Sequence, residues 1–212
     1  MNPNLAEENL RTIRLLMERS AVYRRALAPI MLLAGGLGLA AAALALRFHI
    51  ESPRPFAGLW LGTACLVITS AFLLVRRQAL KDHEPFWSPP TFRVGQALLP
   101  PLLSGLFLGG LLALLDVNES VDFPMTLIWL LFYGCALHAA GFFMARGIKW
   151  LGWVFIGGAI LLVLSFWALS LVTAGWSLRP PAANWVMGLF FGGLHLAYGI
   201  YLYFTENRTP AA

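Results

Sequence analysis

Two histidines stand in long uncharged stretches of the sequence, where an imidazole is the side chain best able to bind a ligand. His138 lies within Leu-His-Ala-Ala-Gly and His195 within Leu-His-Leu-Ala-Tyr-Gly. Imidazole nitrogens serve as axial ligands of haem and can hydrogen-bond to a quinone headgroup. A histidine between apolar helices also bonds hydroxyls or carbonyls of its neighbours. The pair predicts either a site for haem, a quinone or another apolar ligand, or a structural contact between helices.

Two tyrosines accompany these histidines, Tyr133 five residues before His138 and Tyr198 three residues after His195. If both stretches are helices that cross the same layer, a rise of 1.5 Å per residue places the histidines at depths differing by about one helical turn. Both tyrosines could then line one cavity with the histidines. These four residues form the candidate ligand-binding set.

Other chemistry is poorly represented. The uncharged stretches contain no Asp, Glu, Lys or Arg, and the chain has no His-Glu-x-x-His motif and no glycine-rich phosphate loop. Ion-coupled transporters usually place ionisable residues inside their spans, and enzymes need a nucleophile or an acid–base pair. Cys65 and Cys135 both fall in uncharged stretches without metal-ligand spacing. We therefore expect no catalytic residue, no metal site and no disulfide.

The composition is that of a membrane protein. Of the 212 residues, 59% are hydrophobic and 12% are charged, about half the charged fraction of a soluble domain. A helix needs about 20 apolar residues to cross a bilayer. We predict an all-α bundle of six transmembrane helices, over residues 26–46, 56–75, 94–115, 123–145, 150–170 and 184–204. Residues 1–25 would form a cytoplasmic interfacial helix, 26–204 the transmembrane domain and 205–212 a short tail.

The basic residues predict the orientation. All but three of the 15 Lys and Arg fall on one side of the six spans, and the exceptions are Arg47, Arg54 and Arg179. Loops rich in Lys and Arg stay cytoplasmic. Both ends are therefore expected in the cytoplasm, and the membrane is expected to be a bacterial inner membrane. The basic charge reflects topology, and without a recognition motif it indicates no nucleic acid partner.

Two basic surfaces could contact a partner. The segment before the first span carries an apolar stripe of Leu10, Ile13 and Met17, with arginines on its other faces. Such a helix usually lies on anionic lipid, or it can dock a cytoplasmic protein. The second surface is the inner connection of residues 76–93. The candidate lipid or partner contacts are Arg11, Arg14, Arg19, Arg76 and Arg77.

Prolines and glycines predict local features of the spans. Pro100 and Pro101 predict a kink or a late start of the third helix, because proline lacks a backbone donor and clashes with the preceding turn. Glycines four residues apart, at 105 and 109 and at 188 and 192, allow helices to approach closely. They predict packing within the bundle and leave a homodimer open.

Both ends of the chain resemble a family. The opening Asn-Leu-Arg-Thr-Ile-Arg-Leu-Leu-Met-Glu-Arg of residues 9–19 and the ending His-Leu-Ala-Tyr-Gly-Ile-Tyr-Leu-Tyr-Phe-Thr-Glu of residues 195–206 resemble a group of small bacterial membrane proteins. Members of that group tend to be encoded beside a winged-helix regulator. The resemblance implies a link to envelope sensing and assigns no activity and no site residues.

Three functions remain open from the sequence. The leading expectation is a non-enzymatic inner-membrane protein that acts as an interaction or sensory component through its basic cytoplasmic surfaces. The second is a protein that binds haem, a quinone or another apolar ligand at His138 and His195. The third is a transporter of a small solute or lipid, with the proline pair as a hinge.

Overall fold

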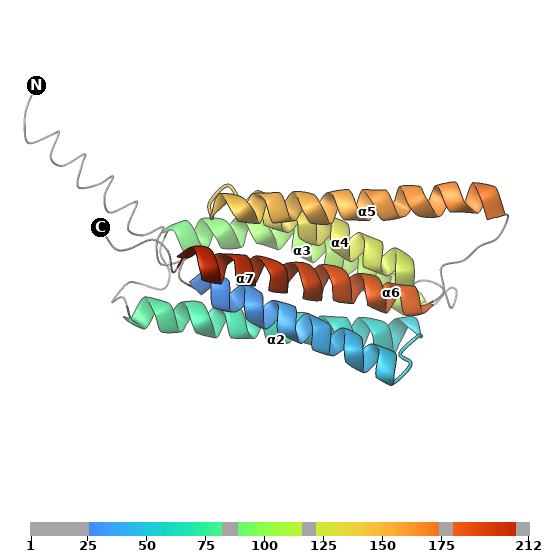
Figure 1. Cartoon of the computed structure of the whole chain (residues 1–212), viewed down its shortest axis with the longest axis horizontal. Helices are drawn as coiled ribbons and strands as arrows, with labels where there is room; N and C mark the ends of the chain where they lie inside the picture. Colours follow the sequence, from blue (N-terminus) through green and yellow to red (C-terminus); the bar gives the residue numbers. More distant parts are fainter. Residues whose placement is uncertain (1–25, 82–88, 116–121, 174–179, 207–212) are drawn as a thin grey trace, which may run out of the picture.

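The computed structural model describes residues 26–81, 89–115, 122–173 and 180–206, and these are almost entirely helical (Figure 1). Six of the described helices are long and apolar enough to cross a membrane, as predicted. They cover Ala26–Arg47, Pro53–Lys81, Thr91–Leu115, Asp122–Ala140, Gly147–Ala168 and Ala183–Thr205. The predicted interfacial helix of residues 1–25, with Arg11, Arg14 and Arg19, lies outside the described residues.

The first span, Ala26–Arg47, is followed by single helices that form the second to fifth spans. These are α2 (Pro53–Lys81), α3 (Pro89–Leu115), α4 (Asp122–Ala140) and α5 (Arg146–Thr173). The sixth span is continuous but has three parts, α6 (Pro180–Met187), the π-helix η1 (Gly188–Leu194) and α7 (His195–Glu206). Figure 1 shows the helices side by side, with their long axes running roughly along one direction.

The helix α4 is the centre of the bundle. It packs along α3 and α5 and also contacts α6 and α2. Half of the apolar window of α4 is buried, compared with 6% for α2. The surface of α2, α3 and α5 is rich in exposed large apolar side chains, such as Phe107 and Leu161. So large an exposed apolar surface is unfavourable in water and is typical of helices that contact lipid.

Glycines set the distance between helices. A Cβ on Gly35 of the first span would lie 2.5 Å from the backbone nitrogen of Leu196, and one on Gly188 would lie 2.7 Å from the Cβ of Ala42. The first and last spans therefore touch backbone to backbone, because a side chain at either glycine would hold them apart. The spaced glycines at 188 and 192 pack within the bundle, as predicted. So do those at 105 and 109, which face Phe132 and Trp129 of α4.

One predicted helix end is wrong, and so is one of the two effects predicted for the proline pair. The helix α3 begins at Pro89 and continues through Pro100 and Pro101, so the prolines do not delay its start, and the alternative, a kink, stays a prediction. The helix α4 ends at Ala140, five residues before the predicted end. The chain turns at Gly141, where a Cβ would lie 2.7 Å from the Cα of Lys149. The fourth span is shorter than predicted because this contact brings α5 back against α4.

The turn after the first span also has a defined geometry. His49 adopts a φ of 51°, and the backbone N–H of Ile50 donates to the carbonyl of Ala45 at 2.9 Å. This left-handed residue and long-reach bond end the helix as a Schellman motif does. The carbonyl of Ile50 is then free to accept a hydrogen bond from Asn184 Nδ2 at 2.9 Å. Asn184 Oδ1 accepts from Trp60 Nε1 at 3.1 Å, so one amide ties the sixth span to α2 and to this turn.

Candidate functional site

The sixth span departs from α-helical geometry in its middle. The π-helix η1 covers seven residues, three of them glycine, and the residues on either side keep right-handed helical torsions. π-helical turns are rare inside helices and occur often at functional sites. The residue that follows this turn is His195.

His195 forms a buried hydrogen-bonded pair with Tyr133 of α4. The Tyr133 hydroxyl and His195 Nε2 lie 2.6 Å apart, and the histidine is 2% exposed. Nδ1 of His195 lies 3.4 Å from the carbonyl oxygen of Phe190. A carbonyl only accepts, so with a proton on Nδ1 the Nε2 atom accepts from the Tyr133 hydroxyl, whereas a proton on Nε2 is donated to the tyrosine oxygen. In either tautomer the short contact joins the two side chains.

Aromatic rings surround this pair. The ring of Phe155, from α5, lies edge-on at 5.0 Å from Tyr133 and 5.5 Å from His195, measured between centroids. Phe191 is stacked on His195 at 6.2 Å with an interplanar angle of 9°. Phe155 is fully buried. The hydrogen bond therefore joins α4 to the sixth span in apolar surroundings, with α5 closing one side.

His138 belongs to a different cluster. Its ring lies edge-on to Phe142 and Trp153, at 5.4 and 5.1 Å. Its Nδ1 is buried without a hydrogen-bond partner among the described residues. On α4, His138 follows Tyr133, the partner of His195, by five residues, a rise of about 7.5 Å at 1.5 Å per residue. His138 therefore lies further along α4 than the residue that meets His195, in a separate cluster.

The candidate set is therefore only partly brought together. Tyr133 and His195 meet, and His138 does not join them. Tyr198 lies beside the N-terminal end of α5, where a Cβ on Gly147 would collide with its hydroxyl. One haem between His138 and His195 would require both rings at one level and a free Nε2, so a haem cofactor stays a prediction without geometric support. Among the described residues, no three His, Cys, Asp or Glu come together as metal ligands.

The remaining candidates lie at the surface. Arg76 and Arg77 are exposed near the end of α2, where they remain accessible to lipid headgroups or a partner. Cys65 and Cys135 are both free thiols within spans, as predicted.

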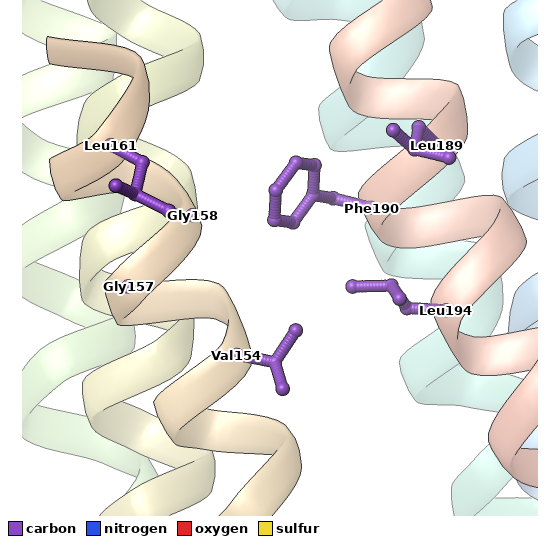
Figure 2. A pocket seen from close by; sticks show the side chains of 7 residues that line it. All are labelled: Val154, Gly157, Gly158, Leu161, Leu189, Phe190 and Leu194. Atoms are coloured by element: carbon purple, nitrogen blue, oxygen red, sulfur yellow. The ribbon is translucent and has the colours of Figure 1, made fainter. Parts of the chain in front are cut away.

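A groove that the sequence did not predict runs between α5 and η1 (Figure 2). It encloses about 400 Å³. Figure 2 shows the ring of Phe190 projecting from η1 into the space beside Gly158 of α5. Ligand pockets in proteins typically enclose about 300–1,000 Å³, so this volume is sufficient for a ligand. The lining side chains are all apolar: Val154, Gly157, Gly158, Leu161, Leu189, Phe190 and Leu194.

The groove lies directly beside the polar pair. The rings of Phe190 and Phe155 are 5.5 Å apart, and Phe155 in turn contacts both Tyr133 and His195. In the sequence, the only indication of this groove was a pair of adjacent glycines in α5 and an aromatic residue in η1. These residues predict a groove only once it is known that their two helices face each other.

Comparisons with protein-family models, with curated proteins and with solved structures find no match for this chain. The described residues form a helical bundle with six helices long and apolar enough to cross a membrane, and its candidate functional features are the groove and the polar pair.

Proposed function

We propose that this chain is a non-enzymatic inner-membrane protein that acts as a sensory or interaction component, and that it senses an apolar, chain-like molecule from the bilayer. The groove between α5 and η1 carries the proposal. Its lining offers a ligand no hydrogen bond and no charge. It lies at mid-span, where only molecules dissolved in lipid arrive. An acyl or isoprenoid chain fits both properties.

Gly157 and Gly158 give the groove its shape. A Cβ on Gly157 would meet nothing within 4 Å, whereas one on Gly158 would collide with the ring of Phe190. The first glycine therefore leaves empty space, and the second accepts the phenyl ring. From Val154 to Leu161 the wall extends over seven residues, about 10 Å along the helix. This is a suitable length for a stretch of extended chain.

A photoreactive lipid tests the groove. We expect a palmitic acid analogue with a diazirine in its chain to crosslink to groove residues of the protein in phosphatidylcholine discs. Gly157→Leu should reduce this crosslinking several-fold, because the leucine side chain fills the empty space. Peptide mapping by mass spectrometry locates the label.

The matched control is Gly110→Leu on α3. Its Cβ also meets nothing within 4 Å, and Gly110 does not line the groove. Labelling of the groove should not change in this variant. A label spread over all lipid-facing helices in proportion to their exposure would mean ordinary annular lipid and would contradict the proposal.

The working orientation has both ends in the cytoplasm. The charge distribution supports it, and it places the exposed Arg76 and Arg77 on the cytoplasmic face together with the basic segment of residues 1–25. We propose that this face transmits the signal to a protein partner or to anionic lipid.

A reporter fusion tests the orientation. An enzyme that is active only in the periplasm should be inactive when fused after Phe204, and active when fused in the connection after Arg47. Activity after Phe204 would mean that the sixth span ends outside, and the proposed signalling face would then be on the wrong side of the membrane.

A further inference from the structure

Behind the groove, beyond its lining residues, lies a polar pair that a purely apolar ligand does not need. Tyr133 and His195 are separated from the groove by the rings of Phe190 and Phe155. His195 is almost fully buried, but Tyr133 is only partly buried. A polar pair in apolar surroundings is costly unless its hydrogen bonds are all made, and the Tyr133 oxygen can accept as well as donate.

The two polar contacts of His195 differ in length, and this decides which of them can be given up. The bond between Tyr133 and Nε2 is short at 2.6 Å, whereas the contact between Nδ1 and the Phe190 carbonyl is long at 3.4 Å. Good N–H···O bonds are about 2.7–3.2 Å long, so the Nδ1 contact is weak. The tautomer that carries the imidazole proton on Nε2 therefore loses little. Nε2 then donates to the Tyr133 oxygen, and the tyrosine hydroxyl is free to donate elsewhere.

We infer that the groove and this pair form one binding site for an apolar chain that carries a carbonyl-bearing ring, that is, a quinone-type headgroup. The chain lies along α5, and the headgroup passes the rings of Phe190 and Phe155 to accept a hydrogen bond from Tyr133. His195, with its proton on Nε2, donates to the tyrosine oxygen throughout, so no proton has to leave the imidazole. The inference rests on the proposed function, because it needs the groove to hold a chain.

Phe190 separates the two parts of this site. Its ring sits in the notch that Gly158 leaves, and a side chain there rotates without moving the backbone. When the ring turns away, the groove reaches Phe155, whose ring contacts both Tyr133 and His195. The backbone carbonyl of Phe190 also faces His195 Nδ1. One residue therefore contacts both the groove and the histidine.

Two small molecules test the inference in the full-length protein. Decylubiquinone and n-decylbenzene share a ring and a ten-carbon chain, but only the first has carbonyl oxygens. Each competes with the diazirine fatty acid for crosslinking in the groove. We expect decylubiquinone to compete about fivefold more strongly, the ratio that one hydrogen bond of about 1 kcal/mol gives. Tyr133→Phe should make the two competitors equal, because it removes the hydroxyl and keeps the ring.

Tyr198→Phe is the matched control, since this tyrosine lies beside the N-terminal end of α5 and should leave the ratio unchanged. Equal competition by both molecules in the unmodified protein would overturn the inference without any variant, while the groove itself would stand. A fivefold ratio that survives Tyr133→Phe would overturn it too. If neither molecule competes and the fatty acid does not label the groove, the proposed function fails as well.

Discussion

Gly152→Leu is expected to lower the free energy of unfolding by about 3 kcal/mol, because it separates the two helices that pack most extensively. A Cβ on Gly152 would lie 2.6 Å from the backbone nitrogen of His138 and 2.8 Å from the carbonyl oxygen of Gly134. Both obstacles are backbone atoms of α4, so no side-chain rotation relieves the clash. The whole of α5 would have to shift away from the centre of the bundle.

The measurement is thermal unfolding of the purified protein in mild detergent, followed by circular dichroism. A loss of this size corresponds to a fall in Tm on the order of 10 °C for a chain of about this length. Gly157→Leu, on the same helix, is the matched control because its Cβ meets nothing within 4 Å. Equal stability of the two variants would mean that the backbones of α4 and α5 do not approach each other closely at Gly152.

Phe155→Ala should have the second largest effect, a loss of about 2–3 kcal/mol of unfolding free energy. Phe155 is fully buried and contacts the rings of Tyr133, Phe190 and His195. In a bilayer, transfer from water contributes little to helix association, since the lipid is as apolar as the interior. The cost comes from the cavity that the missing ring leaves and from lost dispersion contacts.

Unfolding by titration with a denaturing detergent measures this loss. Leu164→Ala, on the same helix, is the control, because Leu164 is 53% exposed and its removal leaves no cavity. A loss for Phe155→Ala no larger than for Leu164→Ala would show that the aromatic cluster does not hold α5, α4 and the sixth span together.

The sequence predicted what depends on length and composition. Six uncharged runs of about 20 residues predicted six spans, and regularly spaced glycines predicted close packing. The end of α4 was missed because it depends on a tertiary contact, Gly141 against Lys149. A helical pattern continues to residue 145, and nothing local indicates that the chain turns five residues earlier.

The candidate site was half predicted for a related reason. Sequence spacing gives the depth of a residue in a span, but the direction in which it points depends on how each helix is rotated. His195 was singled out as a group that binds either a ligand or a neighbouring hydroxyl or carbonyl, and the structure places it against the hydroxyl of Tyr133. The π-helix before His195 also changes the direction in which the side chains after it point, and no periodicity in the sequence indicates this. The position of the groove likewise depends on how α5 and the sixth span are rotated about their axes.

The contact between the first and last spans has a consequence for biogenesis. Gly35 and Gly38 pack against the backbone of the sixth span, which is synthesised after the other five. At about 5–20 residues per second, the first span waits in the bilayer for roughly 10–30 s before that partner exists. Its mean hydropathy of 2.1 favours insertion without a partner. The first and sixth spans can pack only after the sixth has been synthesised, so a chain cut short before it leaves a glycine-lined face open to other helices in the membrane.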